Sequence, residues 1–392
     1  MIENTRSKKP LVYIGIALII ALGLLAGLWY TLAPQKTDIN AKISSGSDIL
    51  YAPPGEGFKR VTQPRAFTFP EDNGSHPEYQ TEWWYYTGNL TDLDGRRFGY
   101  QLTFFRHGLS AAPITRTSEW ATNESYLAHF TITDIDNNQF HAFDQASRGA
   151  AGLAGATSSP LNIFVEGWSA TGDQPTTLRA NRDGIGLELD LSSIKAPTLQ
   201  GDGGVSPRSS KPGDASYYYS LTRMETNGTI RLGEQSFTVE GYSWFDHEWS
   251  TGLLDRGQVG WDWFGIHLDD GQDIKWGQIR QPDGSLVIGN GTITGPASAG
   301  REGGLAPITV LQKNDLRLTV LEKWTSPHTG AVYPSRWRME IPKAGIDIEI
   351  KPFIPDQELR FPLITYWEGA ISVAGSHAGR GYAELTGYGL ER

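Results

Sequence analysis

Short segments of alternating apolar and polar residues recur along most of this 392-residue chain. Turn-forming pairs separate them, for example Asp94-Gly95, Asn227-Gly228 and Asp270-Gly271. Such pairs join antiparallel strands as hairpins, and a long series of hairpins forms a sandwich or a barrel. The 46 glycines and 22 prolines fit this architecture and argue against a helical bundle. The sequence therefore predicts an all-β fold, with one short helix near Asp144–Ala154.

Two stretches of the chain begin alike, which indicates an internal duplication. Glu82-Trp83 opens a strand-like segment that runs to the turn Asp94-Gly95. Asp262-Trp263 opens a similar segment that runs to Asp270-Gly271. Each half is long enough for a barrel of about eight strands, a size that can hold one small ligand in its mouth. We therefore predict two barrel domains, at residues 58–252 and 253–392.

The N-terminus contains a long apolar run. Residues 11–33 carry no charge and are long enough to cross a bilayer as a helix, while Arg6, Lys8 and Lys9 precede them. The positive-inside rule then keeps residues 1–10 in the cytoplasm and exports the rest. A cleaved signal peptide has a shorter apolar core, so an uncleaved anchor is favoured over it. We expect a single-pass inner-membrane protein whose residues 34–57 link the anchor to a periplasmic domain.

Composition excludes several classes of function. The chain has no cysteine, which rules out disulfides, thiolate catalysis and cysteine-bound zinc. Its formal net charge of −10 repels phosphate backbones and argues against nucleic-acid binding. Single, scattered histidines give no metal-binding motif, and no glycine-rich phosphate loop is present. We therefore predict no metal and no cofactor.

Aromatic and acidic residues gather in two places, Thr81–Leu90 and Trp244–Trp263. Tryptophan fills a large buried volume and its N–H needs a partner. Carboxyl groups desolvated among aromatic rings have raised pKa values and can hold a proton for donation. The two clusters together indicate an apolar pocket with acidic or imidazole groups inside it.

Alternation on a strand separates the candidate residues into faces. Asp246 and Glu248 share one face, while His247 and Trp249 share the other. His247 could relay a proton, or it could satisfy a buried carboxylate or carbonyl at the domain boundary. Glu82 shares a face with Trp84, so it lies in a pocket if that face is interior; otherwise it pairs with a base such as Arg106.

Longer strings resemble a known family. They are F-P-E-D-N-G-S-H-P-E-Y-Q-T-E-W-W-Y-Y-T-G-N-L at 69–90, G-Y-S-W-F-D-H-E-W-S at 241–250, and Y-W-E-G-A with G-Y-A-E-L-T-G-Y within 366–388. The chain resembles, over nearly all of 60–392, the lipocalin-like family of bacterial carotenoid 1,2-hydratases and the transporter-associated AttH proteins. The resemblance implies two tandem lipocalin-like antiparallel β-barrels after the N-terminal transmembrane helix, with ligands at or near their junction.

The resemblance also implies acid–base residues, because His247, Trp249 and Asp262 match the His-x-Trp string and nearby aspartate of the hydratases. In alkene hydration a carboxylic acid protonates one carbon, aromatic faces stabilise the cation and water attacks. The candidate catalytic residues are Asp262, His247, Asp246 and Glu82. The candidate ligand-binding residues are Trp84, Trp249, Trp261, Trp263 and Tyr86.

Three functions remain open. The first is an envelope protein that binds a hydrophobic, isoprenoid or lipid-like molecule, in association with an ABC-type transporter or other envelope proteins. The second is a hydratase or hydrolase-like enzyme that acts on such a molecule. The third is a tethered scaffold whose tryptophans serve only as core.

Overall fold

The computed structural model describes residues 55–250, 252, 254, 257–297 and 306–389. The predicted anchor at 11–33 and most of the predicted linker lie outside these residues. Within the part of the chain that is described, no helix is both long and apolar enough to span a bilayer. The described residues all belong to one compact unit.

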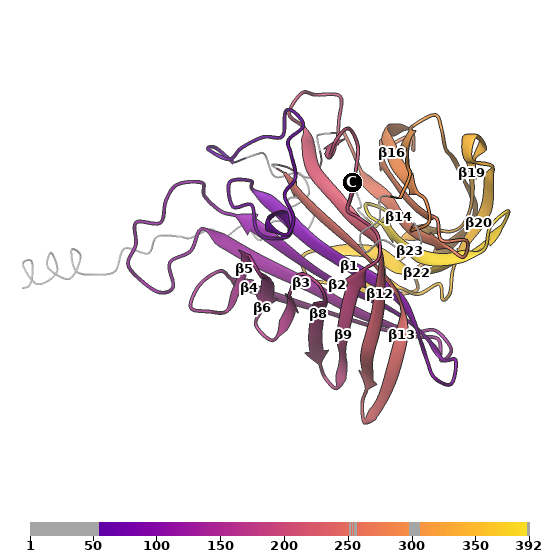
Figure 1. Cartoon of the computed structure of the whole chain (residues 1–392), viewed down its shortest axis with the longest axis horizontal. Coiled ribbons are helices and arrows are strands. Elements are labelled where there is room, and N and C mark those ends of the chain that lie inside the picture. The colour runs from indigo at the N-terminus through magenta and orange to yellow at the C-terminus, as the bar shows by residue number, and fades with distance from the viewer. Residues whose placement is uncertain (1–54, 251, 253, 255–256, 298–305, 390–392) are drawn as a thin grey trace, which may run out of the picture. The chain divides into compact units, whose positions relative to one another are not determined.

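The first half of the described chain forms one antiparallel sheet, sheet A, drawn from indigo to red in Figure 1. Its strands follow the order β4-β3-β2-β1-β13-β12-β9-β8-β7-β6-β5, and β10 and β11 pair with β12. Their bounds are β1 Thr81–Asp92, β2 Arg97–Gly108, β3 Glu124–Asp134, β4 Gln139–Arg148, β5 Ala154–Ser158, β6 Leu161–Val165, β7 Trp168–Thr171, β8 Thr176–Arg182, β9 Ile185–Ser193, β10 Thr198–Leu199, β11 Val205–Pro207, β12 Ala215–Leu232 and β13 Gln235–Ser250.

The second half forms sheet B, drawn in orange and yellow in Figure 1. Its order is β17-β16-β15-β14-β23-β22-β20-β19-β18, and β21 pairs with β22. The bounds are β14 Gly260–Leu268, β15 Asp273–Arg280, β16 Leu286–Thr294, β17 Ile308–Gln312, β18 Arg317–Thr325, β19 Val332–Ile341, β20 Ile346–Pro352, β21 Glu358–Arg360, β22 Thr365–Gly375 and β23 Gly379–Leu385. Two single-turn 3-10 helices, η1 Glu71–Asn73 and η2 Pro342–Ala344, accompany the sheets.

Both sheets must curl, because the strands at their two edges are neighbours in sequence. In sheet A only residues 149–153 join β4 to β5, so these edges lie within about 20 Å of each other. Eleven strands laid flat would hold them about 48 Å apart. In sheet B residues 313–316 join β17 to β18 in the same way. The prediction of an all-β chain with two barrel-like antiparallel sheets is confirmed.

One local prediction was wrong. The stretch Asp144–Ala154, predicted as a helix, contains the end of β4, a turn and the first residue of β5. Its small residues at 149–152 form that turn, in which Ala151 has a φ of 52° and Gly152 a φ of 71°. The predicted domain boundary at 252/253 falls between β13 and β14.

The inner face of each curled sheet carries its apolar core. In sheet A the core includes Trp84, Tyr86 and Phe104, and in sheet B it includes Phe264 and Trp337. A third buried cluster joins the outer faces of the two sheets and contains Tyr85, Trp244, Trp263, Ala370 and Tyr382. We call this contact between the outer faces the junction.

Polar side chains also connect the sheets across the junction. Lys195 and Arg223 of the first half both bind Asp273 on β15, at 2.5 and 2.7 Å. Asn89 on β1 donates to the carbonyl of Gly381 on β23 at 3.0 Å. All of these groups except Gly381 are buried polar or charged side chains, so the two halves are held in one fixed register.

Candidate functional site

The central strands of sheet A divide the predicted residues between two faces. β1 pairs with β13 so that Trp84 lies opposite His247 and Tyr85 lies opposite Asp246. Directly paired residues point to the same side of a sheet, and successive residues point to opposite sides. His247 therefore faces the interior of sheet A and Asp246 faces the junction, although they are neighbours in sequence.

Glu82, His76 and His247 meet inside sheet A. Oε1 of Glu82 lies 2.7 Å from Nδ1 of His76 and 3.0 Å from Nε2 of His247. The other oxygen, Oε2, accepts a hydrogen bond from Nε of Arg106 at 2.9 Å. Glu82 and His247 have no exposed side-chain surface. Glu82 therefore faces the interior of sheet A and also pairs with Arg106.

The remaining nitrogen of each histidine is bound by Asp72, in η1. The Nε2 of His76 lies 3.0 Å from Asp72 Oδ1, and the Nδ1 of His247 lies 2.9 Å from the Asp72 carbonyl oxygen. Arg65 also forms an ion pair with this carboxylate. Burial alone would raise the pKa of Asp72, but the bonds from His76, Thr68 and Arg65 lower it to about 2.

Burial and hydrogen bonding act in opposite directions on this cluster. Burial would raise the pKa of Glu82, but the bonds from His247 and His76 and the charge of Arg106 hold it far below its usual value. Burial lowers the pKa of His247, and the interaction with Glu82 offsets this only in part. The pKa of His76 is raised, because its two carboxylate partners outweigh its burial.

Aromatic rings enclose the same cluster. Trp249 stacks on His76 with ring centroids 3.8 Å apart, and Trp84 stacks on His247 at 4.9 Å. Tyr86 stacks on Phe245 at 4.4 Å, one step further along the inner face. Three of the predicted ligand-binding residues therefore lie inside sheet A, where they are fully buried core side chains.

On the opposite face, Asp246 lies at the junction. It accepts hydrogen bonds from Ser220 Oγ at 2.5 Å, Tyr218 Oη at 2.6 Å and Trp244 Nε1 at 2.7 Å. Burial raises the pKa of Asp246 to about 6 despite these three bonds. Trp263 of sheet B donates from its indole N–H to Tyr218 Oη at 3.0 Å, so it is linked to Asp246 through that hydroxyl.

Sheet B adds two further carboxyl groups to the junction. Glu384 on β23 is paired with Trp263 on one side and with Glu368 of β22 on the other. The indole of Trp261 donates to Glu384 at 3.1 Å. Burial raises the pKa of Glu384 to about 8, and burial together with the charge of Glu384 raises that of Glu368 well above its usual value.

Several buried polar atoms around these carboxyls have no hydrogen-bond partner among the residues that the structure describes. They are Tyr85 Oη, Gln101 Oε1, His129 Nε2, Glu368 Oε1 and Tyr382 Oη. Native proteins pair nearly all of their buried polar groups, so a group of unpaired ones requires an explanation. All five belong to strands that face the junction, namely β1, β2, β3, β22 and β23.

Asp262 is placed apart from both groups. It is paired with Leu385 in the interior of sheet B, where it accepts bonds from Gln278 at 2.8 Å, Arg280 at 3.1 Å and Tyr388 at 3.0 Å. Burial raises the pKa of Asp262 in spite of Arg280. The four predicted catalytic residues therefore occupy three places, and only Glu82 and His247 are in contact.

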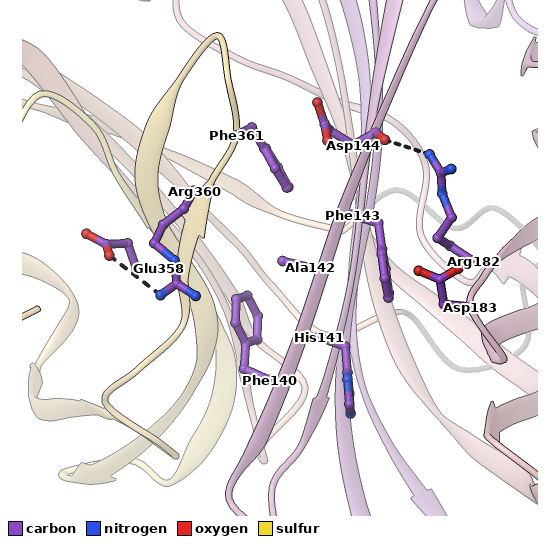
Figure 2. Close-up of a pocket in the computed structure, with 10 residues that line it drawn as sticks. All are labelled: Phe140, His141, Ala142, Phe143, Asp144, Arg182, Asp183, Glu358, Arg360 and Phe361. Carbon is purple, nitrogen blue, oxygen red and sulfur yellow. Dashed lines mark hydrogen bonds and ion pairs between the residues drawn. The ribbon is translucent and has the colours of Figure 1, made fainter. Parts of the chain in front are cut away.

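An open hollow of about 500 Å³ lies beside the edge strand β4 (Figure 2). In Figure 2 Phe140 points to the side of Arg360 and Phe361, while His141 and Phe143 point to the side of Arg182. The ring of Phe361 also packs on His129, with centroids 4.5 Å apart. The hollow is thus separated from the unpaired His129 nitrogen by one aromatic side chain.

The fold, together with the sequence strings at 69–90, 241–250 and 366–388, defines the class of protein. The AttH-like family model matches residues 60–388, so the chain belongs to the AttH-like family. An AttH protein (NE1406) from Nitrosomonas europaea is 30% identical, with 85% of this chain and 100% of that chain covered and a TM-score of 0.75. Kievitone hydratase from Nectria haematococca has the same fold at 16% identity, covering 86% and 98% of the two chains with a TM-score of 0.62. No curated protein matches the sequence.

Four residues at the centre of these two groups carry no recognisable signal of their own in the sequence. Asp72 and His76 are in the string at 69–90, and Glu368 and Glu384 are in the two closing strings. These residues were therefore inside the motifs that carried the family resemblance. Their roles depend on contacts between strands far apart in sequence, so the strings alone did not reveal them.

Proposed function

We propose that this protein binds a small, mainly apolar molecule at the junction between its two sheets. The observation that carries the proposal is the set of buried polar atoms there without a well-formed hydrogen bond, above all His129 Nε2, together with Tyr85 Oη and Glu368 Oε1, which interact electrostatically with each other. A ligand with a few hydrogen-bonding groups would satisfy these atoms. Binding sites of this kind are mostly apolar with a small number of convergent polar groups.

The charge of the junction supports an uncharged ligand. The raised pKa values of Glu368 and Glu384 favour their neutral forms near pH 7. Burial lowers the pKa of Lys275 to about 8, so this ammonium stays mostly protonated near pH 7 and offsets the charge of Asp246, whose pKa burial raises to about 6. The aromatic side chains Trp244 and Trp263 supply apolar contact surface. An isoprenoid or lipid-like molecule with one or two polar groups fits this combination.

A direct test is to purify the full-length protein in detergent, extract it with solvent and identify co-purifying molecules by mass spectrometry. The same molecules, added back, should change the tryptophan fluorescence. Tyr85→Phe and Glu368→Gln should weaken this response. Tyr333→Phe is a matched control, because its hydroxyl bonds Glu358 within sheet B. Absence of any extracted or added ligand that alters the fluorescence would contradict the proposal.

The alternative function is hydration of an alkene, and it rests on the same neutral carboxyl groups. Protonated Glu368 or Glu384 would transfer its proton to one alkene carbon, water would add to the other, and the carboxylate would recover a proton from that water. The rings of Trp261 and Trp263 would stabilise the intermediate cation. An assay for water addition to the extracted ligand, with Glu384→Gln as the inactive variant, separates catalysis from binding.

The proposed location of the protein, at the inner membrane, follows from the apolar character of the proposed ligand. An apolar ligand suits a protein held at a membrane, and the uncharged run at 11–33 would anchor it in the inner membrane with residues 34–57 as tether. A transporter of the ABC type or another envelope protein is the proposed partner. Membrane fractionation with and without residues 1–33, followed by cross-linking in the cell, tests both points. Full-length protein found in the cytosol would contradict the anchor.

A further inference from the structure

We propose that His76, Glu82 and His247 bind a divalent transition-metal ion such as Zn²⁺ inside sheet A. Each residue offers one ligand atom, and these three atoms lie within 4.8 Å of one another. The site lies on the opposite face of sheet A from the junction, so it does not depend on the proposed function.

The distances between the ligand atoms suit one ion. Zinc binds imidazole nitrogen and carboxylate oxygen at about 2.0–2.2 Å in tetrahedral geometry, so two of its ligand atoms are about 3.4 Å apart. The two contacts of Glu82 Oε1, at 2.7 and 3.0 Å, are somewhat shorter than this. Outward movements of these side chains by less than about 1 Å would bring both contacts to the distance that one ion requires.

Asp72 orients both histidines in the way that metal sites require. Its carboxylate binds Nε2 of His76 and its carbonyl binds Nδ1 of His247. Metal-bound histidines generally donate their other N–H to a carboxylate or a carbonyl, which fixes the tautomer and turns the lone pair to the ion. Here both free lone pairs, Nδ1 of His76 and Nε2 of His247, then point at Glu82 Oε1.

Glu82 is held as a monodentate ligand. Its Oε2 accepts bonds from Arg106 at 2.9 Å, from the backbone N–H of His76 at 2.9 Å and from Ser75 Oγ at 3.3 Å. Oε1 shares only the backbone N–H of His76, at 3.0 Å, besides the two imidazoles. The oxygen that faces the histidines is therefore the one available to an ion.

The donor set selects the kind of metal. Two imidazoles and one carboxylate suit Zn²⁺ or Fe²⁺, whereas Ca²⁺ and Mg²⁺ prefer oxygen ligands. The chain has no cysteine that could provide thiolate ligands. The ligands join β1, β13 and the segment that precedes β1, so the ion would fasten that segment to the interior of sheet A.

The sequence prediction of no metal rested on the lack of a local motif. The three ligands are spaced by 6 and 165 residues, which no short motif contains. They meet only because β1 and β13 pair in the register that sets Glu82 opposite Trp249.

The test uses full-length protein purified without a histidine tag, measured for metal by elemental mass spectrometry and titrated with Zn²⁺ and Co²⁺. We expect about one tightly bound ion per chain, a rise in Tm with Zn²⁺ that a chelator reverses, and Co²⁺ absorption typical of nitrogen and oxygen ligands. His247→Gln and Glu82→Gln should abolish all three. Asp72→Asn should reduce the affinity by about 10–100-fold.

His267→Gln is the matched control, because His267 is also buried and binds a carbonyl, that of Thr222. It should retain the ion. If the ligand variants fail to fold, X-ray absorption or anomalous diffraction of the wild-type protein with Zn²⁺ still decides the question. Wild-type protein that binds no ion, or one bound only by surface residues such as His328 and Asp356, would overturn the proposal.

Discussion

Glu368 on β22 and Glu384 on β23 lie directly opposite each other across two paired strands at the junction. Glu368 is fully buried and Glu384 is partly buried. Two carboxylates side by side repel each other, so such a pair holds a proton at a pH where isolated carboxyls have lost theirs. This relationship makes the contribution of the pair to the stability of the protein depend on pH.

We predict that Glu384 contributes a loss of unfolding free energy as the pH rises from about 5 to about 8. Its folded-state pKa is raised by burial to about 8, above the value of 4.5 expected in the unfolded chain. Between these values Glu384 binds more protons in the folded than in the unfolded state, so its contribution to stability is lost as the pH increases. Buried histidines such as His267, whose pKa burial lowers to about 4, act in the opposite direction. Urea unfolding of wild type and Glu384→Gln, followed by tryptophan fluorescence across this range, isolates the contribution of Glu384.

Glu384→Gln should reduce this loss, because glutamine stays neutral at every pH. Its advantage over the wild type should be greatest near pH 8 and small near pH 5. Glu234→Gln is the control, since Glu234 is an exposed side chain. Equal pH dependence in wild type and Glu384→Gln would show that the pair does not retain a proton.

A second prediction concerns the charged contact between the two halves. Asp273 receives Lys195 and Arg223 from the first half, and neither Asp273 nor Lys195 has any exposed side-chain surface. Asp273→Ala leaves two cations unpaired in a buried place and should cost about 3–5 kcal/mol in a chemical unfolding experiment. Glu188→Ala breaks the exposed Arg179–Glu188 pair and should cost no more than about 1 kcal/mol. Similar losses in the two variants would contradict the conclusion that the buried contacts of Asp273 hold the two halves of the chain together.

A third prediction tests how closely the sheets pack at the junction. A Cβ atom at Gly265 would lie 2.4 Å from the Trp263 ring and 3.1 Å from that of Trp244. Gly265→Ala should therefore destabilise the protein by about 1–3 kcal/mol through overpacking. A Cβ at Gly167 meets nothing within 4 Å, so Gly167→Ala should change stability by less than about 0.5 kcal/mol. Thermal unfolding of the two variants provides the comparison.

The sequence predicted the fold better than the sites, for a physical reason. Alternation and Asp-Gly turns are local signals, and they revealed hairpins and the faces of Asp246 and His247. Whether one face of a strand becomes the inner face of its curled sheet or the outer face at the junction depends on how the whole sheet curls. No local sequence pattern encodes that curvature. Asp262 and His247 were grouped because the family resemblance matched them to the His-x-Trp string and nearby aspartate of the hydratases, yet they belong to the interiors of different sheets.

The last prediction concerns Asp246 and His247, which are neighbours in sequence but face opposite sides of sheet A. Asp246→Asn places an amide where Tyr218 now donates a hydrogen bond, while Ser220 and Trp244 can keep their common acceptor, Oδ1. The loss of one buried hydrogen bond should cost about 1–3 kcal/mol. Because Asp246 faces the junction, ligand-dependent fluorescence should change while the metal content does not. His247→Gln should do the reverse. If either variant affects both properties equally, the two faces of β13 are coupled and the sites do not act independently.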